Sequence, residues 1–189
     1  MSKVIERAVH IQLYGFLEST NLLSPNQFGF RQKKSTKLAL TEFTDEILKK
    51  MNEGYLTGVV YIDLKKAFDT VDHVTLLQKL KSIGIKGKDL AWFHSYINAR
   101  LQKTAIGETL SNSRKVTVGV PQGSILGPLL FSTYIYIYIY ILINLSKCLK
   151  HSSSSLFADD TAIYFSSKSL DTLQINLNGL RLGNFSPSQ

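Results

Sequence analysis

Three short stretches of this 189-residue chain carry side chains that could do chemistry together. An apolar, β-branched run ends in Asp63, and a pair of adjacent aspartates, Asp159 and Asp160, stands between two further apolar runs. A carboxylate at a strand end can project into a cleft, and carboxylates from two neighbouring strand ends repel each other unless a cation lies between them. Oxygen ligands without His or Cys favour Mg²⁺, or Mn²⁺, over zinc. Paired ions of this kind stabilise an in-line phosphoryl displacement.

The third stretch is a loop framed by glycine and proline over residues 119–123, which includes Gln122 and Gly123. Each feature also has a simpler explanation. Asp63 alone is more often a residue that ends a strand or caps a helix, and an Asp-Asp pair alone is more often part of a turn. The loop alone is only a turn. The three features in this order are much more specific than any one of them.

Hydrophobic periodicity supplies the elements that would position these residues. Two amphipathic helices are expected in the first 52 residues, with inner faces formed by Ile5, Val9, Leu13 and Phe16 in the first and by Leu40, Phe43, Ile47 and Met51 in the second. The further elements expected are a buried strand at 56–63, helices around 73–83 (ended by Gly84) and 89–99, strand-like pieces at 101–108 and 114–119, a hairpin at 156–165 that turns over 158–161, and a helix capped by Ser169 with Leu170, Leu173, Leu177 and Leu180 inward. This mixture predicts an α+β domain.

Composition narrows the class of protein. Hydrophobic residues make up 44% of the chain, which excludes wholesale disorder. The formal net charge is +8, and +7 of it lies in residues 1–115. A basic region suits a nucleic-acid partner, although a solvated basic face that maintains solubility is equally compatible with it. The only cysteine is Cys148, so no intrachain disulfide can form, and we expect an intracellular protein of the nucleus or cytoplasm that is not secreted.

A strict Tyr-Ile repeat at residues 134–141 does not fit the rest of the pattern. Its period of two is typical of a strand and of cross-β association, and a TA dinucleotide repeat in the coding DNA would produce it. The apolar span 129–145 suggests a membrane helix as one alternative. It has 17 residues, which is shorter than a typical span, and it contains Ser132, Thr133 and Asn144, so no membrane association is expected.

Four motifs in order give the chain a resemblance to a known family. QFGFRQKKST, YIDLKKAFDTVDH, GVPQGSILGPLLF and LFADDTAIY resemble the fingers, first palm, glutamine-bearing and aspartate-pair motifs of the reverse transcriptase domain of non-LTR (LINE-type) retrotransposons. SKVIERAVHIQLYGFLE is similar to the segment upstream of them. The resemblance implies a polymerase palm-like sheet (residues 56–189) with partial fingers (1–55) and no thumb, and with the Tyr-Ile repeat as an insertion.

The resemblance also implies a role for each matching residue. Asp63 and Asp159 would hold two catalytic Mg²⁺ ions, for which Mn²⁺ is the alternative, and Asp160 would complete the acidic group. The backbone carbonyl of Leu64 or Ile62 would add a ligand. We expect the first two carboxylates to lie about 4–7 Å apart.

The other matching residues would contact the nucleotide or the template. Phe68 would lie under the nucleotide sugar and exclude a 2′-hydroxyl, and Gln122 with Gly123 would line the nucleotide pocket. Arg31 would lie near the triphosphate, where a guanidinium can pair with two oxygens. Lys33 and Lys34 would touch the template backbone or nothing, and Asp69 has no role assigned beyond capping.

The function implied is RNA-directed DNA polymerisation, with an RNA template, a DNA primer and deoxynucleoside triphosphates as partners. The alternative is a catalytically inactive remnant of a decayed element that keeps some nucleic-acid affinity. The late start, the early stop and the Tyr-Ile run favour an inactive, poorly soluble chain. They leave the family assignment itself untouched.

Overall fold

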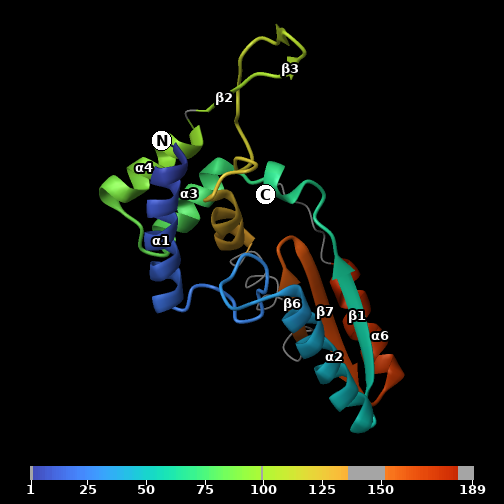
Figure 1. Ribbon diagram of the computed structural model, residues 1–189. Coiled ribbons are helices and arrows are strands. Elements are labelled where there is room, and N and C mark those ends of the chain that lie inside the picture. Colours follow the sequence, from blue (N-terminus) through green and yellow to red (C-terminus); the bar gives the residue numbers. More distant parts are fainter. Residues whose placement is uncertain (1, 99, 136–151, 183–189) are drawn as a thin grey trace. The chain divides into compact units, whose positions relative to one another are not determined.

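The computed structural model describes residues 2–98, 100–135 and 152–182 (Figure 1). Its elements in chain order are α1 (Ser2–Ser19), α2 (Thr36–Asn52), β1 (Leu56–Ile62), the 3₁₀ helix η1 (Ala67–Asp69), α3 (His73–Ser82), α4 (Gly87–Asn98), β2 (Leu101–Gln102), β3 (Ala105–Ile106), β4 (Thr109–Leu110), β5 (Arg114–Lys115), helical residues 127–135, β6 (Ser152–Phe157), β7 (Asp160–Ser167) and α6 (Leu170–Leu182). The expected α+β class is confirmed.

These elements form two compact units. The sheet unit contains residues 24–65 and 152–182, and the helical unit contains residues 2–23 together with the described residues of 66–135. These units divide the chain differently from the expected boundary between fingers and palm at residue 55. The division into fingers and palm stays a prediction.

The sheet unit is built on three antiparallel strands in the order β1-β7-β6. In the β1–β7 register, Val60 pairs with Ile163 and Ile62 pairs with Thr161. Alternate residues of a strand point to opposite faces of the sheet, so each face has its own set of side chains. On one face Ile163 and Phe165, 1% and 2% exposed, form a core cluster with Leu173 of α6. This cluster fixes α6 against the strands.

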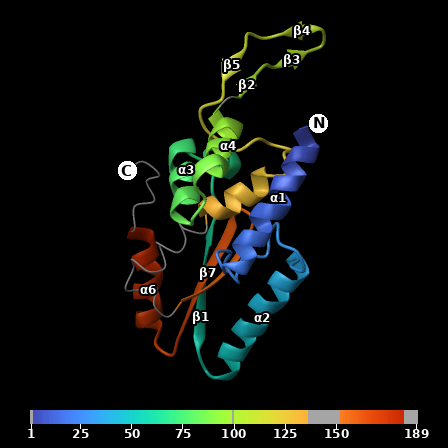
Figure 2. The same cartoon turned by 90° about the vertical axis from the view of Figure 1, so that its left-hand side faces the viewer.

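The opposite face of the sheet packs against α2. The Phe43 and Tyr164 rings meet edge to face with centroids 5.1 Å apart. The Glu46 carboxylate accepts hydrogen bonds from the Ser153 and Tyr164 hydroxyls, both at 2.6 Å. Burial, followed by the Glu46 carboxylate, raises the pKa of Tyr164. Figure 2 shows α2 and α6 on opposite sides of the strands, as this pairing requires.

The expected helices are present, but parts of their expected inner faces are wrong. Leu40 and Met51 of α2 are 65% and 58% exposed, while Ala39 is buried. Ile5 of α1 is 53% exposed, and Leu17, which the periodicity did not select, is fully buried. The buried faces differ from the expected ones because each helix buries only part of its circumference. A period of 3.6 residues leaves several adjacent faces equally apolar, so the periodicity alone does not select the buried face.

Local signals cap and end the helices. The Leu38 N–H donates to the Ser35 side chain at the start of α2. The Thr172 N–H donates to Ser169 Oγ at 3.4 Å, so the expected cap of α6 is confirmed. The expected stop at Gly84 is also confirmed, since this residue follows α3 with φ of 107°, a conformation that glycine adopts without strain.

The helical unit packs α1, α3, α4 and helical residues 127–135 around a common core. Its fully buried side chains include Leu17, Leu76, Leu80, Ile97, Leu126, Leu130 and Phe131. The short pairs β2-β5 and β3-β4 form an arm that extends from the end of α4 (Figures 1 and 2). The expected strand-like pieces therefore belong to an exposed arm and not to the sheet.

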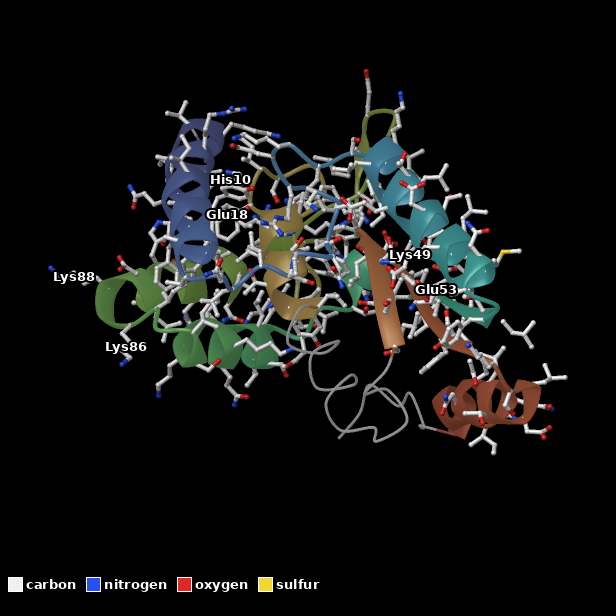
Figure 3. All side chains as sticks on the ribbon, turned by 90° about the horizontal axis from the view of Figure 1, so that it is seen from below. His10, Glu18, Lys49, Glu53, Lys86 and Lys88 are labelled. Atoms are coloured by element: carbon white, nitrogen blue, oxygen red, sulfur yellow. The ribbon has the colours of Figure 1, made fainter. Side chains whose placement is uncertain are left out.

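Figure 3 shows Lys86 and Lys88 pointing away from the helices at the start of α4.

The Tyr-Ile repeat begins inside a helix. Tyr134 and Ile135 are helical and Ile135 is 6% exposed, so the strand conformation expected from the alternation is wrong for these two residues. Residues 136–141 and Cys148 lie outside the described residues. Among the helices that the structure describes, none has the length and apolar content needed to cross a membrane.

Candidate active site

The register of the sheet unit brings the catalytic candidates to one end of one sheet. The last pair between β1 and β7 is Ile62 with Thr161. Asp63 follows the first member of that pair directly, and Asp160 precedes the second. Asp63 and Asp160, which are 97 positions apart in sequence, therefore lie next to the same residue pair of two antiparallel strands. Asp63 and Asp160 are exposed at this end.

Asp159 lies in the tight turn between β6 and β7. Phe157 pairs with Asp160, which leaves Ala158 and Asp159 as a two-residue loop, shorter than the expected turn over 158–161. Ala158 has φ of 58°, and Asp159 is not among the residues with positive φ. Positive φ at the first loop position alone distinguishes a type II′ from a type I′ hairpin turn, and glycine is the usual residue there. Ala158 is 8% exposed, so surrounding contacts hold this unfavourable conformation in place.

A segment from the expected fingers motif supports this turn. The Phe28 N–H donates to the Leu156 carbonyl at 2.7 Å, and the Leu156 N–H donates to the Asn26 carbonyl at 2.9 Å. Gln27 forms a parallel bridge with Leu156. The segment thus extends the sheet alongside β6 by a short stretch. Gln27 and Phe28 are both 4% exposed.

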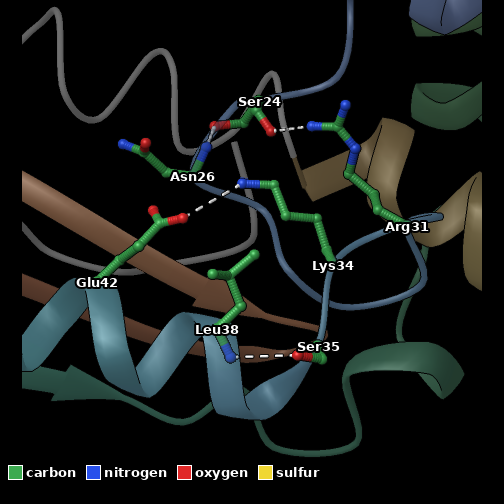
Figure 4. A network of polar contacts seen from close by, with 7 residues as sticks. All are labelled: Ser24, Asn26, Arg31, Lys34, Ser35, Leu38 and Glu42. Carbon is green, nitrogen blue, oxygen red and sulfur yellow. Dashed lines mark hydrogen bonds and ion pairs between the residues drawn. The ribbon is translucent and has the colours of Figure 1, made fainter.

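Arg31 and its basic neighbours follow that segment (Figure 4). Arg31 Nη1 donates to the Ser24 carbonyl at 2.6 Å, which folds the side chain back over its own loop. Lys34 Nζ lies 3.9 Å from a Glu42 carboxylate oxygen and 4.2 Å from the Phe28 ring centroid. Lys33 has φ of 62° and is exposed. The sheet unit thus holds Arg31 near the strand segment, and contacts with phosphate stay predictions for all three basic residues.

In the helical unit, the glutamine-bearing loop is fastened to the segment after η1. The Gly119 N–H donates to the Val71 carbonyl and the Val120 N–H donates to the Phe68 carbonyl, both at 2.8 Å. A Cβ on Gly119 would lie 2.9 Å from the Asp69 carbonyl oxygen, and φ at this glycine is 88°. Only glycine fits such a close approach. Two backbone hydrogen bonds and a close approach of the backbones therefore join the two segments.

Asp69 completes this connection through its side chain. Gln122 Nε2 donates to Asp69 Oδ1 at 2.8 Å. Both residues line a pocket of about 540 Å³, together with Arg100, Gln102, Val118 and Pro121. Lys3 Nζ donates to the Gly123 carbonyl at 2.6 Å, and Gly123 has φ of 70°. Gln122 and Gly123 are thus positioned from two sides. Sequence reasoning had assigned Asp69 no such role.

Phe68 stacks on Phe131 with centroids 4.3 Å apart. Phe131 is 1% exposed, and Phe68 is half-buried. One ring face of Phe68 therefore packs into the core of the helical unit. A half-buried ring can pack in this way and still present an edge to a bound nucleotide.

Two buried polar residues beneath the loop were missed by sequence reasoning. His73, 3% exposed, donates from Nε2 to the Gly119 carbonyl at 2.8 Å. Glu6, 7% exposed, accepts the Ile125 N–H at 2.7 Å, just before helical residues 127–135 begin. Glu6 lies on the apolar side of α1, where a charged residue breaks the hydrophobic pattern. That break was the available signal.

The expected site residues divide between the two units. Asp63, Leu64, Asp159, Asp160, Arg31, Lys33 and Lys34 belong to the sheet unit, and Phe68, Gln122 and Gly123 belong to the helical unit. Within the described residues, no group of three or more His, Cys, Asp or Glu side chains is arranged to hold a metal ion. Mg²⁺ is usually bound by one or two carboxylates together with water and substrate phosphates, so the donor chemistry at this strand end suits it without a larger protein cage.

Comparison with known proteins identifies the family. Residues 1–181 match the reverse transcriptase (RNA-dependent DNA polymerase) family. The chain is 32% identical over 167 residues to the probable RNA-directed DNA polymerase from transposon BS of Drosophila melanogaster, and 29% identical over 168 residues to that from transposon X-element of the same species. These alignments cover 88% and 89% of this chain but 18% of each relative. The chain therefore spans less than a fifth of the length of these relatives.

Solved structures show the same fold. Apo telomerase from Candida tropicalis superposes with a TM-score of 0.65 at 13% identity, over 95% of this chain and 34% of the telomerase chain. Telomerase from Candida albicans, solved with a TWJ fragment of telomeric RNA, gives 0.65 at 12% identity, over 94% and 32%. The palm-like α+β fold expected from the motifs is thereby confirmed. With its four motifs in order and its matched residues 1–181, the chain belongs to the reverse transcriptase family and is related to the polymerases of non-LTR retrotransposons.

Proposed function

We propose that this chain is the nucleotidyl-transfer part of an RNA-directed DNA polymerase. Its substrates would be deoxynucleoside triphosphates, an RNA template and a DNA primer. The observation that carries the proposal is the antiparallel register. It places Asp63 and the Asp159-Asp160 pair at one end of one sheet, although nearly a hundred residues separate them.

The strand-end carboxylates would hold divalent ions. Asp63 and Asp159 are the proposed Mg²⁺ or Mn²⁺ ligands, with Asp160 beside them and the Leu64 carbonyl as a further donor. Bound there, such ions would activate the primer 3′-hydroxyl and stabilise the charge of the leaving pyrophosphate. The hydrogen-bonded hairpin and β1 hold the backbone of these residues at the strand end before the substrate arrives, which lowers the cost of organising the site during the reaction.

The helical unit would select and orient the nucleotide. Gln122 and Gly123 would line its pocket, and Asp69 would keep the Gln122 amide in place through the 2.8 Å hydrogen bond. Phe68 would exclude a 2′-hydroxyl by its bulk. Because Phe131 supports one face of the Phe68 ring, the ring cannot easily withdraw from a ribonucleotide.

The basic residues of the sheet unit would bind phosphates. Arg31 is bonded to the Ser24 carbonyl, and a triphosphate would compete for its guanidinium with two oxygens at once. A charge-assisted pair of hydrogen bonds is stronger than one bond to a neutral carbonyl, so the exchange is favourable. We infer that the protein acts inside the cell, in the nucleus or the cytoplasm, where template and nucleotides are present.

The test uses a chimera in which this chain replaces the matching segment of the transposon BS polymerase. We expect template-dependent incorporation of deoxynucleotides with Mg²⁺ or Mn²⁺. Asp63→Asn and Asp159→Asn should each abolish extension and leave template binding nearly unchanged, because they remove stabilisation of the transition state and not of the bound substrate. Glu53→Gln, at the end of α2, is the control substitution of an exposed acidic residue and should extend like the unmodified chimera.

Two outcomes would contradict the proposal. Extension by the Asp159→Asn chimera would remove this residue from the site. A chimera that binds primed RNA and never extends it, with its flanking segments intact, would favour the inactive remnant with residual nucleic-acid affinity.

A further inference from the structure

The QFGF segment contacts the Ala158–Asp159 turn so closely that a residue with a Cβ would not fit at Gly29. A Cβ added to Gly29 would lie 2.3 Å from the Ala158 nitrogen, 2.9 Å from the Ala158 Cα and 3.2 Å from the Phe157 carbonyl carbon. The backbone of Gly29 therefore rests directly on the backbone of the turn. Unlike glycines at positive φ, Gly29 is required here by lack of space and not by its own conformation.

The side chain of Gln27 spans the same contact. Its Oε1 accepts the Gly29 N–H at 3.2 Å, and its Nε2 donates to the Ala158 carbonyl in a long hydrogen bond of 3.5 Å. Gln27 is 4% exposed, so both ends of the amide find their partners inside the protein. An amide can do this because it carries a donor and an acceptor on one planar group.

The turn itself needs an external support. Ala158 adopts a positive φ, which is an unfavourable conformation for an L-residue with a Cβ. Such a conformation persists only where neighbouring groups determine it. Gly29 contacts Ala158 from one side, and the Gln27 amide donates to the Ala158 carbonyl.

We propose that Gln27 and Gly29 are positioning residues for Asp159. They hold Ala158 in its left-handed conformation, and this sets the direction in which the next residue, Asp159, presents its carboxylate. The inference rests on the proposed metal-binding role of Asp159. It gives the fingers motif a role at the catalytic turn that is separate from the phosphate contact proposed for Arg31.

The experiment measures Mn²⁺ binding to the 189-residue chain by the loss of the free-ion electron paramagnetic resonance signal. Gly29→Ala places a methyl group where the Ala158 backbone lies, and Gln27→Met keeps the length of the side chain but removes both hydrogen bonds. We expect each to weaken Mn²⁺ binding at least about tenfold. Asn26→Ala is the matched control, because its side chain reaches Ser154 and not the turn. It should stay within twofold of the unmodified chain.

A second control separates positioning from stability. Leu173→Ala removes a side chain from the core cluster under α6 and destabilises the sheet unit. Mn²⁺ binding is measured at a temperature well below the thermal unfolding midpoint of every variant. Under this condition Leu173→Ala should bind Mn²⁺ like the unmodified chain. If it weakens binding as much as Gln27→Met, the effect is one of stability and the inference is wrong. If Gly29→Ala does not fold, Gln27→Met decides the question.

Amide chemical shifts distinguish failure of this inference from failure of the proposed function. In a ¹⁵N-labelled chain, the Ala158 and Asp159 amides should shift strongly in Gln27→Met and hardly at all in Asn26→Ala. Unchanged shifts and unchanged Mn²⁺ binding in Gln27→Met would overturn the inference. Mn²⁺ binding that survives Asp159→Asn would instead overturn the metal role, whatever the turn does.

Discussion

At the scale of single residues, neighbours decide what a side chain does. Asp69 has the same chemistry as Asp63, but the Gln122 amide occupies one of its oxygens at 2.8 Å. It therefore positions a loop, whereas Asp63 stands at an exposed strand end. Phe68 likewise has a neighbour, Phe131, that supports one face of its ring. Substitutions at these two positions therefore test whether Phe68 excludes ribonucleotides.

We predict that Phe68→Val admits ribonucleotides in the chimeric polymerase. The smaller side chain removes the obstacle to the 2′-hydroxyl, so the ratio of kcat/KM for deoxynucleotide over ribonucleotide should fall at least about tenfold. Phe131→Leu is the companion variant. It removes the ring that supports Phe68 from within the core, so it should lower stability and should lower the ratio by less than Phe68→Val does, because the Phe68 ring itself remains. An unchanged ratio in Phe68→Val would show that Phe68 serves only in packing.

At the scale of elements, one buried cation links α3 to the start of the Tyr-Ile repeat. Lys79, 9% exposed, donates from Nζ to the Tyr134 carbonyl at 2.7 Å and lies 4.2 Å from the Tyr134 ring centroid. Burial lowers the pKa of Lys79 to about 8. The carbonyl and the ring face offset part of the cost of burying the charge.

We predict that the free energy of unfolding rises with pH between about pH 8 and 10. In this window the folded protein has lost the Lys79 proton while the unfolded chain, with an ordinary lysine pKa of 10.5, still holds it. The unfolded state then binds more protons, so stability increases with pH, by less than about 1 kcal/mol per pH unit because solvent screens the partly buried amine. Above the ordinary tyrosine pKa of 10.0 the free energy of unfolding falls again with pH. Burial raises the pKa of Tyr164 and Tyr96, so the folded protein still holds protons that the unfolded chain has lost.

Urea denaturation at pH 7.5, 8.5 and 9.5 measures this slope. In Lys79→Met the slope should disappear, since methionine has a similar length and no charge. Lys81→Met, two residues further along and on the exposed side of α3, should keep the slope of the unmodified chain. A flat profile in the unmodified chain would contradict the assigned environment of Lys79.

At the scale of the whole molecule, charge is distributed unevenly along the chain. Residues 1–115 carry +7 of the net +8. Basic side chains that neutralise phosphates release counterions, so binding of this kind weakens steeply with salt. The two loop lysines of the fingers motif differ in this respect, because Lys33 is exposed whereas Lys34 contacts Glu42 and the Phe28 ring.

We predict that single-stranded RNA binds the 189-residue chain with a linear dependence of log K on log salt concentration. Lys33→Ala should reduce the magnitude of that slope by about 1, as expected for one lost phosphate contact. Lys34→Ala should change the slope less and should lower the melting temperature more. Equal slopes for Lys33→Ala and the unmodified chain would show that Lys33 makes no phosphate contact.

The sequence by itself determined the family, the class of fold and the identity of the catalytic candidates. Local signals suffice for these: β-branched runs end at Asp63, Gly84 ends α3, and four motifs occur in a fixed order. A cap such as Ser169 or a positive-φ glycine acts within a few residues of itself, so its effect can be predicted without the rest of the molecule.

Only the tertiary structure decided which helix faces are buried and what supports the site. Leu40 and Met51 are exposed because the α2 face that meets the sheet is the one carrying Ala39 and Phe43. Gly29 rests on Ala158, and Asp69 holds Gln122, although more than fifty residues separate each pair. Such contacts depend on which surfaces pack together in the folded chain. The residue pattern within one segment does not specify the distant segment against which it will pack.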